Sequence, residues 1–364
     1  MSFLWLCKRL ITGDIELELD HSNSNEKKKR VLASAPRILA TGEISPLVTS
    51  ILGRFGTIEI AAKTDEKTLI SLMPRTIALF VRGVTLISAA VIDNAKDLVV
   101  IGRTGTGYDN IDIGAATRRG IPVIYTPGAG ARSVAEGTMA MILSLVKKIP
   151  MLDQKTRCGE WTVRENAVIG DMQGMVLGII GLGRIGREVA NLARAFDMDV
   201  IAFDPGISGT TPTPPRTRLV SLDELLRNSD VITVHAPLND GTKGMLDKGR
   251  LNSVKKGAIL VNLARGGLIE SLDVIYEALE SGQLQSVGLD VYPVEPPDVT
   301  HPIFKHPNAL LTPHAMALSI KASEAIFSMA SNGMAAILEG RVVPNVVNPE
   351  VFAGGVLRQA ARES

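Results

Sequence analysis

The 364-residue sequence is poor in cysteine, with Cys7 and Cys158 alone, and it has no long hydrophobic run. Two cysteines cannot form a disulfide framework, and their spacing fits no metal site, so we expect a reducing, cytoplasmic environment and no bound metal. No apolar run reaches the roughly 18 residues that suggest a membrane span. The N-terminus is apolar before it is basic, the reverse of a secretory signal.

Aromatic residues make up only 4% of the chain, whereas hydrophobic residues make up 45%. This composition predicts a core of Ile, Leu, Val and Ala, as in parallel sheets covered by helices. The formal net charge of +1 gives no drive toward nucleic acid or an anionic membrane, so any anion binding must be local. The length allows two domains, each with a sizeable core.

Short apolar runs alternate with helical segments from residue 37 onward, which predicts parallel β-α units in an α/β fold with two such domains. Residues 1–36 do not fit this pattern and form an N-terminal extension without an assigned function. Its basic run at 27–30 could bind an anion or serve nuclear import, but a solvated linker is the favoured interpretation. The expected strands are 38–40, 57–60, 77–81, 98–101, 123–125, 176–180, 200–203, 231–234, 258–261, 287–291 and 310–312.

Several other segments have predictable roles. We expect a helix over 133–149 limited by Pro150, an irregular region over 158–173, and a loop over 205–215. Trp161 is interpreted as an aromatic anchor for an interface or arm rather than a ligand contact. Other expectations are a helix at 322–338, a Pro-rich surface segment at 293–307 and a C-terminal tail at 348–364.

The stretch from Val176 to Asp204 predicts a dinucleotide site. A buried strand leads into GLGRIG, where Gly181 permits a tight turn, Gly183 admits a pyrophosphate, and Gly186 lets the next helix pack closely. The free N–H groups at that helix start favour phosphate binding. Asp204 lies near the spacing of about 20 residues at which a carboxylate meets ribose hydroxyls, which favours NAD.

Three later segments supply residues for chemistry at the nicotinamide end. Arg265 follows a strand in a Gly-containing turn, Asp290 and Glu295 lie in a loop, and His314 follows a short strand. Alone, each is more often solvated or structural. Together they fit hydride transfer to a 2-oxo acid: Arg265 binds the carboxylate and polarises the carbonyl, His314 moves the hydroxyl proton, and Glu295 holds the imidazole.

The motifs GLGRIG at 181–186, NLARGG at 262–267, GLDVYPVEPP at 288–297 and TPHA at 312–315 resemble the D-isomer-specific 2-hydroxyacid dehydrogenase family. The resemblance implies two Rossmann-like or flavodoxin-like domains with a cleft between them, and a homodimer. The substrate-binding domain would comprise 37–131 plus 319–347, and the NAD-binding domain 132–318.

The same resemblance assigns roles to individual residues. It makes Arg265, Glu295 and His314 catalytic, and it places Asp290 on the nicotinamide carboxamide. The remaining cofactor contacts that it implies are Arg184, Ile185, His235 and Ala264, although a structural role for His235 is about as well supported.

Segments 81–93 and 101–112 look most like the phosphoglycerate dehydrogenase branch, which implies that Arg82, Gly83, Val84 and Gly105 bind the substrate. Two positions depart from that branch, with Gly130 where relatives carry Asn and Gly137 where they carry His. A glyoxylate or hydroxypyruvate reductase therefore stays open as an alternative. So does a non-enzymatic, NAD(H)-sensing protein similar to a corepressor.

Overall fold

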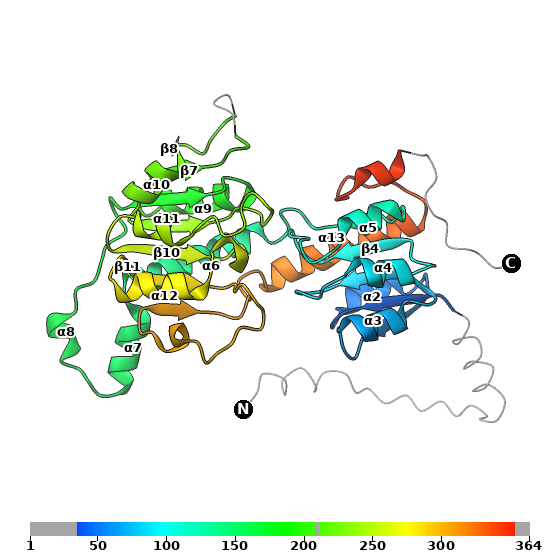
Figure 1. Ribbon diagram of the computed structural model, residues 1–364, viewed down its shortest axis with the longest axis horizontal. Helices are drawn as coiled ribbons and strands as arrows, with labels where there is room; N and C mark the ends of the chain where they lie inside the picture. Colours follow the sequence, from blue (N-terminus) through cyan, green and yellow to red (C-terminus); the bar gives the residue numbers. More distant parts are fainter. Residues whose placement is uncertain (1–34, 208–210, 354–364) are drawn as a thin grey trace. The chain divides into compact units, whose positions relative to one another are not determined.

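The computed structural model describes residues 35–207 and 211–353 (Figure 1). Most of the predicted N-terminal extension and the last part of the predicted C-terminal tail lie outside these residues, as does part of the predicted loop at 205–215. The described helices include none that is long and apolar enough to span a bilayer. Two parallel sheets organise the described chain, as the alternation of apolar runs and helical segments predicts.

The first sheet is fully parallel, with the order β2-β1-β3-β4-β5, which is the flavodoxin-like order. Every residue of its central strand β3 is buried, as expected for a strand covered on both faces. Alternate side chains enter opposite cores: Leu79 and Val81 pack on one face, Ala78 and Phe80 on the other. The strands are β1 Arg37–Ala40, β2 Thr57–Ile60, β3 Thr76–Val81, β4 Val100–Arg103 and β5 Val123–Ile124.

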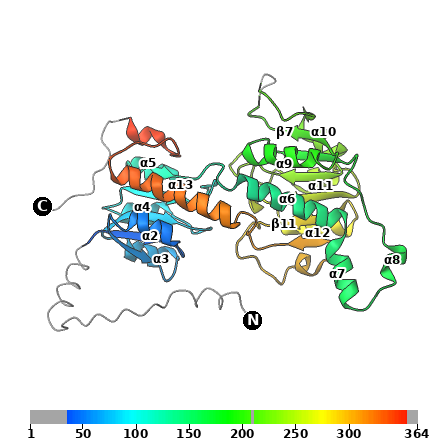
Figure 2. The same ribbon diagram turned by 180° about the vertical axis from the view of Figure 1, so that it is seen from behind.

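Helices from both ends of the described chain cover the first sheet. The long helix α13 packs against α2 and β4, so a late segment joins the layer built by the early ones (Figure 2). Its approach is close because Gly102 carries no side chain: a Cβ there would lie 2.1 Å from Met334 Sδ. The helices are α2 Pro46–Leu52, α3 Glu66–Leu72, α4 Ala89–Asn94, α5 Ile113–Arg118 and α13 Ile320–Leu338.

The second sheet is also fully parallel, in the order β12-β11-β10-β9-β6-β7-β8. Six of its strands follow the dinucleotide-binding order 3-2-1-4-5-6, and β12 extends the edge. Because all strands run the same way, the loops after them meet at one edge. The strands are β6 Val176–Ile180, β7 Asp199–Phe203, β8 Thr217–Leu219, β9 Val231–Val234, β10 Ala258–Asn262, β11 Leu284–Leu289 and β12 Ala309–Leu311.

Helices lie on both faces of this second sheet, and α6 packs against α9 on one of them. The helices of this part are α6 Ala131–Val146, α7 Ile149–Arg157, α8 Val163–Asn166, α9 Arg184–Arg194, α10 Leu222–Asn228, α11 Lys248–Asn252 and α12 Leu272–Glu280. Three short 3₁₀ segments complete the described chain: η3 Gly266–Leu268, η4 Pro302–Lys305 and η5 Pro349–Phe352.

The predicted helix at 133–149 is wrong at its C-terminal end. Helix α6 stops at Val146, Lys148 adopts a left-handed backbone with φ 51°, and Pro150 then lies in the first turn of α7. Proline has no N–H to donate, so it is tolerated at a helix start, and here it opens a helix rather than closing one. The region expected to be irregular, 158–173, contains the short helix α8.

Strand boundaries also differ from the prediction. The expected strand 98–101 is β4, two residues later, and the expected strand 287–291 is β11, which starts at Leu284 and ends at Leu289. The edge strand β8 was not expected at all. Hydrophobic patterns report burial, whereas strand bounds depend on backbone pairing, and Leu98 and Val99 are buried before the strand begins.

Candidate active site

The residues predicted to carry chemistry follow neighbouring strands of the second sheet. Arg265 lies three positions after β10, Glu295 six after β11, and His314 three after β12. These strands are adjacent in the order β12-β11-β10, and the Gly-rich turn follows β6 in the same sheet. In open α/β sheets, ligands bind at the carboxyl ends of the strands, so the topology brings all four segments to a ligand-binding edge.

The Gly-rich turn is built from glycines with different steric constraints. Gly181 has φ +94°, and a Cβ on it would lie 2.7 Å from the backbone nitrogen of Ala236. A Cβ on Gly186 would lie 2.2 Å from the carbonyl oxygen of Gly181. A Cβ on Gly183 would meet nothing within 4 Å, so this glycine faces open space at the start of α9. No side chain caps α9 there, which leaves its first N–H groups for an anion.

Asp204 follows β7 and closes this turn. Its Oδ2 accepts the N–H of Leu182 at 2.9 Å, and its Oδ1 accepts the N–H of Gly206 at 2.9 Å. A carboxylate has about four acceptor positions, so these bonds orient Asp204 and leave capacity for ribose hydroxyls. Nearby, Ile185 packs against the core beneath the turn. The Cδ of Arg184 lies 3.0 Å from where a Gly128 Cβ would be.

His235 follows β9 directly beside the Gly-rich turn. Burial lowers the pKa of its imidazole to about 3, so the ring is neutral at physiological pH. Its Nε2 lies 3.0 Å from the hydroxyl of Thr233, while its buried Nδ1 has no hydrogen-bond partner among the described residues. Buried polar atoms are normally satisfied, so this nitrogen is available to a bound group.

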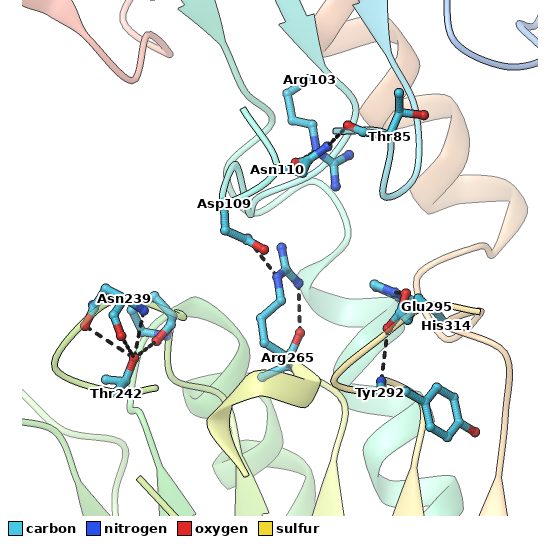
Figure 3. Close-up of polar contacts among 12 residues, drawn as sticks. Thr85, Arg103, Asp109, Asn110, Asn239, Thr242, Arg265, Tyr292, Glu295 and His314 are labelled. Carbon is cyan, nitrogen blue, oxygen red and sulfur yellow. Dashed lines mark hydrogen bonds and ion pairs between the residues drawn. The ribbon is translucent and has the colours of Figure 1, made fainter. Parts of the chain in front are cut away.

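Arg265 is held in an extended backbone by Asn262, the last residue of β10. The fully buried Asn262 amide donates to the carbonyl of Arg265 at 2.9 Å and accepts the N–H of Ala264 at 3.0 Å. The guanidinium donates through Nη1 to its neighbour's carbonyl at 2.8 Å, and through Nε to Asp109 at 2.8 Å (Figure 3). Its Nη2 has no hydrogen-bond partner within 35–207 and 211–353, so the guanidinium keeps N–H donors for a carboxylate.

Glu295 and His314 form a hydrogen-bonded pair. His314 Nδ1 donates to Glu295 Oε2 at 2.7 Å, and the N–H of Tyr292 donates to Glu295 Oε1 at 3.1 Å (Figure 3). Burial alone would raise the pKa of Glu295. The hydrogen bonds from His314 and Tyr292, with the charges of His314 and Arg265, outweigh burial and lower that pKa. The bond from Nδ1 leaves Nε2 of His314 for a substrate.

Asp290 supports the turn that carries His314. Its carboxylate, 2% exposed, accepts the Thr312 hydroxyl at 2.6 Å and the N–H groups of Ala315 and Met316 at 2.9 and 3.2 Å. His314 itself has φ +54°, a left-handed conformation that a non-glycine residue keeps only when its surroundings impose it. The hydrogen bonds to Asp290 hold the backbone of His314 in this conformation. The predicted contact of Asp290 with the nicotinamide carboxamide stays a prediction.

The segment predicted to bind substrate lies beside Glu295. Arg82, Gly83 and Val84 line a cavity of about 550 Å³, together with Glu295 and Pro296. The Arg82 guanidinium lies 4.8 Å from the ring centroid of Phe327, and burial lowers its pKa.

Gly105 lies in the loop after β4, beside a buried arginine. Its φ is +154°, and a Cβ on it would lie 2.9 Å from Nη1 of Arg103. Sequence reasoning missed two other residues of this loop: Asp109, which contacts Arg265, and Gly107, where a Cβ would lie 1.4 Å from Arg265 Nη2. The Asp109 contact spans 156 residues, and a single sequence carries no local signal for such a pair.

The fold and this edge are those of a dinucleotide-binding α/β protein whose strand-end loops carry an arginine and a hydrogen-bonded His–Glu pair. A family model for the D-isomer specific 2-hydroxyacid dehydrogenase NAD-binding domain matches residues 139–316. A glyoxylate reductase from Aeropyrum pernix is 32% identical over 325 residues, which cover 87% of this chain and 97% of the relative. The chain belongs to the D-isomer specific 2-hydroxyacid dehydrogenase family.

Other relatives support the same family. A D-3-phosphoglycerate dehydrogenase from Archaeoglobus fulgidus is 38% identical over 314 residues, or 86% of this chain, but the match spans only 59% of that relative. Among solved structures, D-lactate dehydrogenase from Aquifex aeolicus, complexed with NAD and lactic acid, superposes with a TM-score of 0.77 at 26% identity. That superposition covers 87% of this chain and 98% of the other.

NAD is the cofactor of this family's binding domain, and the residues described above fit it. The open space at Gly183 would admit the pyrophosphate at the uncapped start of α9, and Asp204 at the end of β7 would take the adenosine ribose. The unpartnered Nδ1 of His235 lies beside the same turn.

We predict that Gly183→Val separates folding from cofactor binding. A Cβ at position 183 would meet no atom of the described chain within 4 Å, and the backbone there, with φ −72°, is not left-handed, so the midpoint of thermal unfolding should shift by less than about 3 °C. The side chain would occupy the space for the pyrophosphate, so the Kd for NADH should rise at least about tenfold. Fluorescence titration with NADH measures this change. Unaltered NADH affinity would exclude Gly183 from the phosphate site.

Proposed function

We propose that the protein is an NAD-dependent oxidoreductase that interconverts a D-2-hydroxy acid and its 2-oxo acid. The observation that carries this proposal is the placement of Arg265, Glu295 and His314 after three adjacent parallel strands, in the sheet that also holds the Gly-rich turn. A pure binding protein would not need a partly buried carboxylate with a lowered pKa hydrogen-bonded to a histidine.

Each catalytic side chain has a distinct task in reduction. Arg265 binds the substrate carboxylate and polarises the carbonyl, which stabilises negative charge on the carbonyl oxygen. His314 donates a proton from Nε2 to that oxygen, and Glu295 stabilises the imidazolium before transfer. Bound NADH supplies the hydride. In oxidation, His314 accepts the hydroxyl proton instead.

Two substrate classes follow from the relatives. D-3-phosphoglycerate is the first, because several relatives are named D-3-phosphoglycerate dehydrogenase. In addition, the cationic side chain of Arg82 lines the cavity beside Glu295. Glyoxylate or hydroxypyruvate is the second, because the relative that this chain spans almost completely is named a glyoxylate reductase. The exposed apolar side chains of Val84 and Leu86 line the same cavity. They favour this second class, whose substrates carry a small or uncharged group beside the 2-oxo acid.

We also propose that two copies associate through α7, α8 and the segment that follows. Helix α7 has no buried residue, and both helices stand away from the second sheet in Figures 1 and 2. This arm exposes Ile149 by 51%, Trp161 by 66% and Val168 by 77%. Large exposed apolar side chains on such an arm favour an interaction site, and the family resemblance favours a second copy as the partner.

The cytoplasm is the compartment that this function favours. Cys158 is exposed and unpaired, and such thiols persist in reducing surroundings.

A substrate panel with Arg265→Ala tests the catalytic proposal. The wild-type protein should oxidise NADH with at least one of glyoxylate, hydroxypyruvate, phenylpyruvate, 2-oxoglutarate and phosphohydroxypyruvate. Arg265→Ala should lower kcat/KM by about 100-fold or more, because transition-state charge loses its partner, while NADH affinity changes little. Arg227→Ala, which breaks only an exposed pair with Asp223, serves as control. No turnover of any acid would refute the proposal.

The arm is tested by the double variant Trp161→Glu, Val168→Asp. Sedimentation should give the wild-type protein twice the mass of one chain, and the variant the mass of one chain, because two charges would be buried at the interface. Val342→Asp, at an exposed valine outside the arm, should remain dimeric. A wild-type monomer, or a variant that stays dimeric, would contradict this mode of association.

A further inference from the structure

Asp109, in a loop of the first sheet, contacts Arg265 of the second sheet. It lies in the loop after β4, and its Oδ1 accepts Nε–H of Arg265 at 2.8 Å (Figure 3). Both side chains are partly buried, with 35% and 23% of their surfaces exposed. A charge-assisted N–H···O bond of this length orients both side chains.

The loop is shaped to receive the guanidinium. Gly107 leaves the volume that Arg265 Nη2 occupies, since a Cβ there would lie 1.4 Å from that nitrogen and 3.0 Å from Asp109 Oδ1. The two glycines of the GTG motif at 105–107 therefore each leave space for an arginine side chain, because Gly105 provides the corresponding space beside Arg103. Any larger residue at 107 would displace Arg265 from Asp109.

A second set of bonds fixes the loop itself. Arg103 is 7% exposed, and its Nε donates to Asn110 Oδ1 at 3.2 Å. The Asn110 amide donates in turn to the carbonyl of Thr85 at 2.6 Å. Thr85 belongs to the segment that lines the cavity beside Glu295. The residue next to Asp109 is thus tied to the predicted substrate segment.

The charges of this cluster are unbalanced without Asp109. Burial, with the nearby charge of Arg265, lowers the pKa of Arg103 to about 10, and Asp109 opposes that change. Removing the carboxylate would leave Arg103 and Arg265 facing each other with no anion between them. The guanidinium of Arg265 would then lose both its hydrogen-bond acceptor and the charge that draws it toward the loop.

We infer that Asp109 is a positioning residue that fixes the Arg265 guanidinium through Nε and thereby sets the orientation in which Arg265 meets the substrate carboxylate. This inference rests on the proposed 2-oxo acid chemistry and adds a residue that acts only through Arg265. A residue that touches no substrate should alter the rate in proportion to its effect on Arg265.

A double-mutant cycle tests this dependence. Asp109→Ala should lower kcat/KM for the best acid of the panel by about 10- to 100-fold, since small misplacements of a binding group carry losses of this size. Asp109→Asn keeps an oxygen that can accept Nε–H and should lose less. In an Arg265→Lys background, which lacks the guanidinium fork, Asp109→Ala should change kcat/KM by less than about threefold. Asp171→Ala, which removes a carboxylate paired with Lys147 on the surface, is the control.

Oxalate binding gives a readout that does not need turnover. In the presence of NADH, Asp109→Ala should weaken oxalate binding in parallel with kcat/KM, measured by titration calorimetry. Equal losses from Asp109→Ala in the wild-type and Arg265→Lys backgrounds would overturn the inference, as would unchanged oxalate affinity. Failure of the proposed function looks different, because the wild-type protein would then turn over no acid, whatever oxalate does.

Discussion

The hydrogen bond between Glu295 and His314 is the interaction on which the proposed chemistry depends. At 2.7 Å it fixes the imidazole through Nδ1 and leaves Nε2 for the substrate. Burial works against a charged Glu295, so the carboxylate must be compensated, and His314, the Tyr292 N–H and Arg265 together do so. Asp290 in turn holds the left-handed His314 in place through the backbone of Ala315 and Met316. The geometry and the charge of the Glu295–His314 pair therefore depend on neighbouring residues as well as on the two side chains themselves.

The second sheet provides the frame for this pair. Parallel strands deliver the Gly-rich turn, Arg265, Glu295 and His314 to one edge, although they are separated by more than a hundred residues of sequence. The cofactor half depends on backbone geometry, as Gly181 and Gly186 show, because any side chain at either position would collide with the main chain. The chemical half depends on side chains that the buried Asn262 and Asp290 hold in position.

Much of the fold and of the candidate site could be predicted from the sequence, and the physical reason differs between the sheets, the Gly-rich turn and the side-chain contacts. Buried parallel strands are continuous apolar runs, so the fold and both sheets were predictable, and the glycine spacing after β6 identified the dinucleotide turn. Helix ends were less predictable, because Pro150 can close one helix or open the next. The Asp109–Arg265 contact could not be predicted, since it joins loops that meet only after folding. The role of Asp290 beneath His314 was hidden for the same reason.

The pH dependence of 2-oxo acid reduction, for wild type and Glu295→Gln, tests the central claim most directly. In the proposed mechanism His314 must hold a proton to donate it, so kcat should fall as pH rises. A neutral amide at 295 no longer stabilises the imidazolium, so the alkaline limb of the profile should move to lower pH in that variant. Glu280→Gln, which alters the separate pair with His306, should leave the profile unchanged. An identical profile for wild type and Glu295→Gln would contradict the account.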